Sequence, residues 1–342
     1  MQYRLFVSGY TDDPTQEGVA VVTFDGSRLK KTGGLKGLRN PSYLQPDEGK
    51  IYIVEETRET AEISCAAYQI DGGLEFLWRR TVPGSGLCHI TPAGPYLFAA
   101  GYSGGTLTGV RKDNGENIFF KEFYGHGLNL RRQEKAHVHS ALLSPDGTRI
   151  IAADLGTDRL YQFMLEKNGT LRADNQPWIQ VAGGTGPRHF VFHPNGKWVY
   201  LVGELDLSLN VLRYEEHQLK WVNKYSLGQK GREESLLAAD VRVTADGKFV
   251  YASVRGLDII CGFRIRDEGG LLEPIGSVYS EGQCPRSIDI SPDDRYLAVA
   301  NQLSDEIIVF QRDLNDGELI RDVCCMGFSQ ISCVKWEKIV EI

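Results

Sequence analysis

The stretch RHFVFHPNGKWVYLVGEL, residues 188–205, has the pattern of a β-hairpin. An alternating apolar and polar strand leads to the turn HPNG, and KWVYLV forms the return strand. Because the two strands are antiparallel, Arg188 at the start of the first and Glu204 at the end of the second meet at the open end of the hairpin. A surface ion pair would explain the two charges, unless the rest of the chain repeats the arrangement.

The hairpin pattern recurs about every fifty residues. Three other copies align with it without gaps: HSALLSPDGTRIIAADLG from His139, ADVRVTADGKFVYASVRG from Ala239 and RSIDISPDDRYLAVANQL from Arg286. Looser copies begin at Ser42 and Cys88, and a shortened one, SCVKWEKIV, begins at Ser332; successive starts are 46 to 51 residues apart. Such a period indicates a repeat architecture.

Each gapless copy continues through a polar tip into a third strand and then, after a turn rich in Asp, Asn and Gly, into a weaker fourth strand. Four antiparallel strands per repeat are typical of a β-propeller blade. Six full copies and one divided copy predict an all-β, seven-bladed β-propeller. We expect the C-terminal strand from Ser332 to Val340 to pair with Tyr3 to Tyr10, which closes the ring by joining both ends of the chain in one blade. We assign residues 1–342 to a single domain.

Composition restricts the class of protein. The chain has 342 residues, a net charge of −7 and 42% hydrophobic residues, so it lacks the basic field that nucleic-acid binding needs. We find no secretory signal pattern and no apolar run of membrane-spanning length. Seven cysteines without a CxxC pair favour reduced thiols in a cytoplasmic protein. We expect a monomer or weak homo-oligomer that contacts neither nucleic acid nor membrane.

The repeats also make positions comparable between blades. The first strand of each blade lines the central channel, and its start lies at the same end of the channel as the end of the second strand. The first-strand starts are Ser42, Cys88, His139, Arg188, Ala239, Arg286 and Ser332. The second-strand ends are Tyr10, Glu56, Tyr102, Leu155, Glu204, Arg255 and Gln302. Arg188 and Glu204 therefore belong to two rings of positions around one channel mouth.

Three arginines, Arg188, Arg255 and Arg286, fall in these rings, although the protein is acidic overall. Like charges at one mouth repel unless carboxylates or a bound anion offset them. One interpretation is a solvated rim in which Glu204 pairs with its neighbours. The other is an anion-binding pocket in which His139 and Glu204 act as acid and base.

Other polar residues surround this mouth. His137 and His139 form an H-x-H, but no third ligand is evident, so we expect no metal and no cofactor. His89, His189 and His193 are expected to be structural. The long polar connection before His139 carries Arg132 and is either a binding loop or a solvated one. The residues expected to bind substrate are Arg286, Gln302, His137 and Arg132.

The segments RRQEKAHVHSALLSPDG from 131, GPRHFVFHPNGKWVYLVGEL from 186 and CPRSIDISPDDRYLAVANQLSD from 284 carry a family resemblance. Over nearly its full length the chain resembles the seven-bladed propeller lactonases, a family that includes 6-phosphogluconolactonases and carboxymuconate-lactonizing cyclases. The resemblance implies four active-site residues: His139, Arg188, Glu204 and Arg255.

The resemblance favours hydrolysis of a sugar lactone, with 6-phospho-D-glucono-1,5-lactone of the pentose phosphate pathway as the expected substrate. The arginines would bind its phosphate or polarise its carbonyl, and either His139 or Glu204 would activate water. A muconate-type cyclase using the same residues is one alternative. A non-catalytic propeller that binds proteins is the other. No GxSxG motif is present, which favours direct attack by water over an acyl-enzyme.

Overall fold

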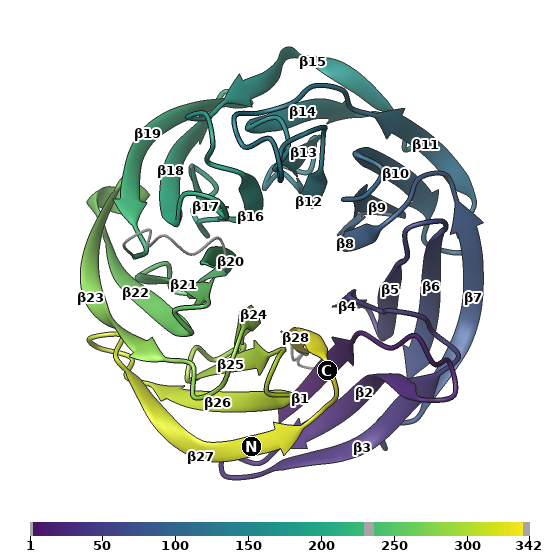
Figure 1. Cartoon of the computed structure of the whole chain (residues 1–342), viewed down its shortest axis with the longest axis vertical. Helices are drawn as coiled ribbons and strands as arrows, with labels where there is room; N and C mark the ends of the chain where they lie inside the picture. Colours follow the sequence, from purple (N-terminus) through teal and green to yellow (C-terminus); the bar gives the residue numbers. More distant parts are fainter. Residues whose placement is uncertain (1–2, 229–235, 338–342) are drawn as a thin grey trace.

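The computed structural model describes residues 3–228 and 236–337. Its strands form seven four-stranded antiparallel sheets, arranged as blades around a central axis (Figure 1). The expected all-β, seven-bladed propeller is therefore confirmed. Among the described residues the one helical element is the short 3₁₀ turn η1 (Asp267–Gly269), and no helix there has the length and hydropathy to span a membrane.

Six blades follow one another along the chain, each running from its innermost strand to its outermost. They comprise β4 (Tyr43–Asp47), β5 (Lys50–Glu56), β6 (Ala61–Tyr68) and β7 (Leu74–Val82); β8 (Leu87–Ala93), β9 (Tyr96–Gly101), β10 (Thr106–Arg111) and β11 (Asn117–Glu122); β12 (Val138–Leu143), β13 (Arg149–Asp154), β14 (Arg159–Leu165) and β15 (Leu171–Gln180); β16 (Pro187–Phe192), β17 (Trp198–Gly203), β18 (Ser208–Glu215) and β19 (Gln218–Ser226); β20 (Leu237–Val243), β21 (Phe249–Arg255), β22 (Ile259–Arg266) and β23 (Leu271–Tyr279); β24 (Pro285–Ile290), β25 (Tyr296–Asn301), β26 (Glu306–Arg312) and β27 (Leu319–Gly327).

The seventh blade joins the two ends of the chain. Its innermost strand is the C-terminal β28 (Ile331–Trp336), followed outward by β1 (Tyr3–Gly9), β2 (Glu17–Phe24) and β3 (Leu29–Lys36). The register pairs Leu5 with Trp336 and Val7 with Val334, as expected. The last residues of the expected strand, 338–340, lie outside the described part of the chain.

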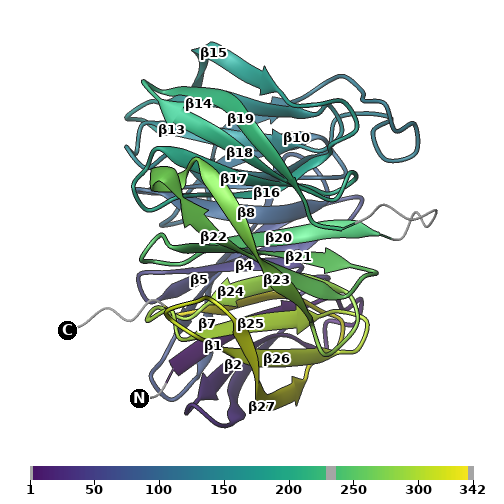
Figure 2. The same ribbon diagram turned by 90° about the vertical axis from the view of Figure 1, so that its left-hand side faces the viewer.

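Burial explains why the sequence forms this ring. In the middle strands both faces pack against neighbouring blades, so β21 is buried at every residue. In the outermost strand β7, by contrast, most residues are exposed and only two are buried. Apolar clusters fill the spaces between blades, as in the one that joins Tyr200 and Val202 to Val250 and Ala252. The side view shows the blades stacked around the axis (Figure 2).

The repeated turn is set by one backbone position. Gly147, Gly196 and Gly247 have φ of 72°, 73° and 70°, and Asp294 takes the same place with φ of 62°. Glycine adopts this left-handed conformation freely, and aspartate does so more readily than most residues. The hairpin turns of the four gapless copies therefore share one geometry despite the change from PDG to PDD.

Candidate active site

The two rings of positions expected from the repeats meet at one mouth of the central channel. A small cavity there is lined by six of the seven first-strand starts, Ser42, Cys88, His139, Arg188, Arg286 and Ser332, together with Tyr43, Glu56, His189 and Ser287. The space in which the centre of a water molecule can lie is about 10 Å³, close to what one water molecule needs. The cavity brings these first-strand starts together, as the repeat register predicts, and Glu56 is the second-strand end among its lining residues.

Glu204 is the centre of the main charged cluster. Its Oε1 accepts a hydrogen bond from Arg132, and its Oε2 lies 2.8 Å from Arg255 Nη2 and 2.9 Å from Arg188 Nε. The side chain is only 2% exposed. Burial by itself would raise the pKa of Glu204, but attraction to Arg255, Arg132 and Arg188 outweighs it and lowers the pKa to about 2. Glu204 is therefore an ionised counter-ion shared by three guanidinium groups.

Arg188 is the largest fully buried side chain of the protein's described part. It donates from Nη1 to the carbonyl of Ala239 in the next blade, while its Nε meets Glu204 without an aligned hydrogen bond. Burial and repulsion from Arg255 lower the pKa of Arg188 to about 10, against the opposing effect of Glu204. A buried arginine with an unaligned N–H is suited to a further anionic or carbonyl oxygen.

A second charged cluster reaches the same cavity through Arg286 and Glu56. Arg286 donates from Nη2 to the hydroxyl of Tyr10 at 2.8 Å and stacks on its ring, and the Tyr10 hydroxyl donates to Glu56 Oε2 at 2.6 Å. The two clusters together hold four arginines and two glutamates, an excess of two positive charges. Such an excess at a partly buried mouth favours an anionic ligand.

His139 lines the cavity with Arg188 of the first cluster and Arg286 of the second. Its ring is buried, its Nδ1 lies 3.8 Å from Cys88 Sγ, and no described residue makes a hydrogen bond to its Nε2. Burial and the positive charges of Arg188 and Arg286 hold the pKa of His139 well below its usual value. The imidazole is therefore neutral at physiological pH.

The remaining predicted residues lie at the edge of this arrangement. Arg132 reaches Glu204 from the connection between β11 and β12, which projects from one face of the ring (Figure 2). Both ring nitrogens of His137 are engaged, Nδ1 with the carbonyl of Tyr102 and Nε2 with Glu134, and His137 is not among the residues that line the cavity. Gln302 contacts Cys284 at the end of β25. Residues 3–228 and 236–337 contain no group of three or more His, Cys, Asp or Glu arranged to hold a metal.

The family of the chain follows from comparison with known proteins. The model of the family described as "Lactonase, 7-bladed beta-propeller" matches residues 4–336. The chain belongs to this family. The 6-phosphogluconolactonase of Formosa agariphila is 31% identical over 332 residues, which cover 92% of this chain and 94% of that one. The 6-phosphogluconolactonase of Bacillus subtilis is 29% identical, with 87% and 88% covered.

Solved structures agree with this membership. A protein from Bacteroides fragilis superposes with a TM-score of 0.91 at 28% identity, covering 98% of each chain. The periplasmic gluconolactonase of Pseudomonas aeruginosa superposes with a TM-score of 0.89 at 27% identity, covering 98% of this chain and 99% of that one.

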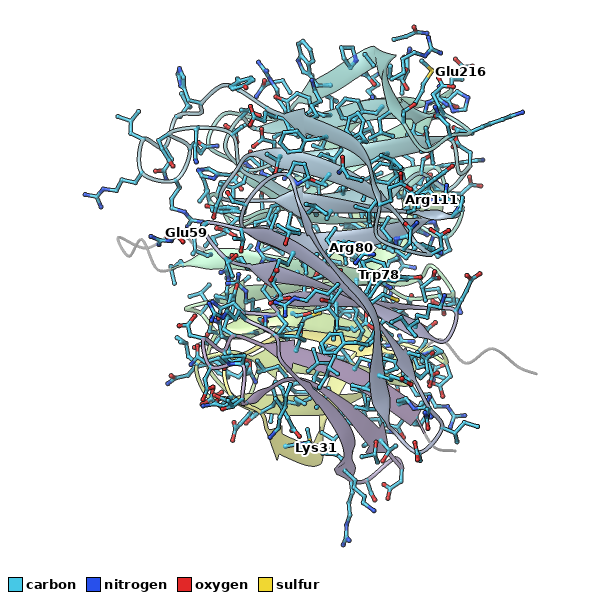
Figure 3. The ribbon with its side chains drawn as sticks, turned by 90° about the vertical axis from the view of Figure 1, so that its right-hand side faces the viewer. Lys31, Glu59, Trp78, Arg80, Arg111 and Glu216 are labelled. Atoms are coloured by element: carbon cyan, nitrogen blue, oxygen red, sulfur yellow. The ribbon has the colours of Figure 1, made fainter. Side chains whose placement is uncertain are left out.

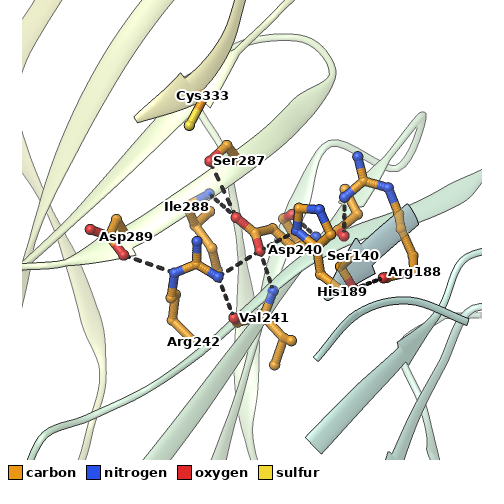
Figure 4. A network of polar contacts seen from close by, with 12 residues as sticks. Ser140, Arg188, His189, Asp240, Val241, Arg242, Ser287, Ile288, Asp289 and Cys333 are labelled. Carbon is orange, nitrogen blue, oxygen red and sulfur yellow. Dashed lines mark hydrogen bonds and ion pairs between the residues drawn. The ribbon is translucent and has the colours of Figure 1, made fainter. Parts of the chain in front are cut away.

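Within this lactonase-family ring, a network of polar residues that sequence reasoning missed adjoins Arg188 and His189 (Figure 4). Asp240 accepts hydrogen bonds from His189 Nδ1 at 2.9 Å, from Arg242 Nη1 at 2.7 Å and from Ser287 Oγ at 3.2 Å. Arg242 Nε also donates to Asp289 at 2.8 Å. Asp240 directly follows Ala239, the first-strand start of its repeat, so the repeat register could have placed Asp240 near the channel. A single Asp beside an apolar residue did not mark it as part of a polar network.

The neighbouring histidines have structural partners. His189 lines the cavity and is held by Asp240, His89 stacks on Tyr43 with 4.5 Å between ring centroids, and His193 lies 3.0 Å from the carbonyl of Gly247 in the next hairpin turn. The five cysteines whose side chains are described are free thiols, and the side chains of Cys324 and Cys325 lie outside the described residues.

The channel mouth offers no activated nucleophile among the described side chains that line the cavity. The Ser287 hydroxyl donates to Asp240, and the Ser332 hydroxyl donates to the carbonyl of Ser42 at 2.8 Å. Neither hydroxyl therefore donates a hydrogen bond to a histidine that could act as its base. Burial raises the pKa of the Cys88 thiol, and its Sγ lies 3.3 Å from the carbonyl of His139. Cys88 is therefore a protonated thiol, not the thiolate that nucleophilic attack needs.

Proposed function

We propose that this protein hydrolyses a sugar lactone, and that its substrate is 6-phospho-D-glucono-1,5-lactone. The observation that carries the proposal is the excess of two positive charges around a cavity that also holds the neutral His139. An ester with an anionic tail complements these charges, whereas unphosphorylated gluconolactone leaves them unbalanced. The names of the relatives from Formosa agariphila and Bacillus subtilis support this substrate.

The arginines have the properties that binding and carbonyl polarisation need. Arg188 and Arg255 are held by Glu204 at fixed positions, so they meet a phosphate or a developing oxyanion without reorganisation. Arg286 and Arg132, with Gln302 and His137 farther out, are proposed to contact the rest of the substrate. Charge-assisted hydrogen bonds to such groups contribute about 1.5–3 kcal/mol each.

The acid and base roles expected for His139 and Glu204 differ in their support. Each oxygen of Glu204 already meets at least one guanidinium, and its low pKa makes it a weak proton acceptor. We assign Glu204 to holding the three arginines. His139 is proposed to face the ester as a neutral hydrogen-bonding group, because its Nε2 has no partner among the described residues.

We further assign the reaction to the oxidative pentose phosphate pathway and to the cytoplasm. The described cysteines are free thiols, which a reducing compartment maintains.

The test is hydrolysis of freshly generated 6-phosphogluconolactone by the purified protein, followed above the spontaneous rate. Gluconolactone and a carboxymuconate serve as control substrates. Catalysis of lactone opening supports the proposal. Cyclisation of the muconate with no lactone hydrolysis would refute it in favour of a lactonizing cyclase.

A further inference from the structure

Two carboxylates occupy equivalent positions in different blades. Glu56 ends β5 and Glu204 directly follows β17, so each stands at the end of a second strand, at the same channel mouth. They are the two carboxylates among the seven second-strand ends. Their surroundings, however, give them different chemistry.

Both carboxylate oxygens of Glu204 are engaged, because three guanidinium groups surround the side chain. Glu56 makes no ion pair within 4.0 Å with a described cation. Its Oε2 accepts one hydrogen bond, from Tyr10, and its Oε1 accepts none from the described residues. Arg286 reaches the Tyr10 hydroxyl rather than the carboxylate. Glu56 therefore keeps a lone pair for another proton donor.

The cavity brings this carboxylate next to the reacting region. Glu56, His139, Arg188 and Arg286 all line it, and its volume is suited to a single water molecule. His139 is a poor acceptor for a proton from that water, because its imidazolium would lie beside Arg188 and Arg286. A carboxylate that gains a proton there loses negative charge but creates no new cation.

We propose that Glu56 is the catalytic carboxylate of the lactonase reaction, accepting the proton of the attacking water. The proposal rests on the proposed function and names a residue that the family resemblance does not supply. Tyr10 and Arg286 are its positioning residues: Tyr10 donates to Oε2, so that Oε1 is left without a hydrogen-bond donor among the described residues.

The step balances with water and the lactone alone. The water oxygen forms a bond to the lactone carbonyl carbon while its proton passes to Glu56 Oε1, and the carbonyl oxygen becomes an oxyanion beside the arginines. When the carbonyl re-forms, the bond to the ring oxygen breaks and the ring oxygen takes the proton from Glu56. The product is the open-chain hydroxy acid, which releases its acidic proton to solvent.

Tyr10 suits the positioning role. Burial raises the pKa of its hydroxyl, with a further contribution from Glu56, against the opposing charge of Arg286. Tyr10 therefore remains a protonated donor to Glu56 throughout the physiological pH range.

The experiment is steady-state kinetics of Glu56→Gln on 6-phosphogluconolactone. Glutamine keeps the shape and can still accept the Tyr10 hydrogen bond. We expect kcat to fall about 10²- to 10⁴-fold with KM changed less than threefold. The matched control is Glu59→Gln, an exposed glutamate in the connection from β5 to β6 (Figure 3), which should behave as wild type.

A second variant separates catalysis from folding. Glu56→Ala should regain activity on addition of formate, a small carboxylate, while formate leaves the wild type and Glu59→Gln unaccelerated. Glu56→Gln with kcat within threefold of wild type, or Glu56→Ala that is folded but not rescued, would overturn the role of Glu56. A wild-type protein that opens no lactone would instead refute the proposed function.

Discussion

Arg255 forms an ion pair with Glu204 across 2.8 Å, although the two residues are 51 positions apart in the sequence. That separation is one repeat: both stand at or just past the ends of second strands, β17 and β21, in adjacent blades (Figure 1). The charged mouth is therefore assembled between blades, with Arg188 and Glu204 from one blade and Arg255 from the next. Substitutions there should affect a shared charge balance as well as a single contact.

Loss of one arginine should lower activity more on an anionic lactone than on a neutral one. For Arg188→Ala and Arg255→Ala we expect kcat/KM on 6-phosphogluconolactone to fall about tenfold to a hundredfold, since each loses a charge-assisted bond. Measuring gluconolactone with the same preparations provides the control, because partial unfolding lowers both rates equally. Equal losses on the two substrates would mean that the arginines polarise the carbonyl and do not hold phosphate.

Glu204→Gln should destabilise the fold as well as impair binding. It leaves the buried Arg188 and its neighbour Arg255 without their counter-charge, a change that typically costs about 3–5 kcal/mol. We expect a lower free energy of unfolding in denaturant and a raised KM. A stable variant with normal KM and strongly reduced kcat would show that Glu204 itself transfers the proton.

The same cluster predicts how stability depends on pH. The pKa of Glu204 lies at about 2 in the folded protein against a usual 4.5, so its contribution is fully present above about pH 4.5 and is lost as pH falls toward 2. A shift of this size corresponds to about 3 kcal/mol. The difference in unfolding free energy between wild type and Glu204→Gln should therefore shrink between pH 6 and pH 3. A difference that is independent of pH would contradict the assignment of Glu204 as the ionised centre of the cluster.

Cys88→Ala should retain activity. Although its sulfur lies 3.8 Å from His139 Nδ1, the thiol is buried and its pKa is raised, so it supplies no thiolate. We expect kcat within about threefold of wild type, allowing for a small repacking effect on His139. Activity abolished in Cys88→Ala, together with a trapped acyl-enzyme detected by mass spectrometry, would establish covalent catalysis instead.

The ring and its closure follow from the sequence because the four gapless repeats align residue by residue, and the same register predicts the place of the candidate site. Four gapless copies fix the hairpin, and Asp294 at the turn shows that one backbone conformation is required there. The same register brings His139, Arg188, Glu204 and Arg255 to one mouth.

The sequence could not show which of these charged residues pair with one another and which carboxylate stays available for water. Arg132 comes from a connection outside the repeats, and only its conformation brings it to Glu204 rather than to Glu56. Tyr10 and Glu56 stand in looser copies, where an identical position does not reveal that a hydrogen bond joins them. Which carboxylate stays available for water depends on these long-range contacts.

The most direct test of the central claim is the ratio of kcat/KM for 6-phosphogluconolactone to that for gluconolactone in the wild-type protein. If the mouth binds an anionic lactone, one phosphate contact of about 1.5–3 kcal/mol predicts a ratio of at least about ten, falling as ionic strength rises. A ratio near one at every salt concentration, or a preference for the neutral lactone, would contradict the claim.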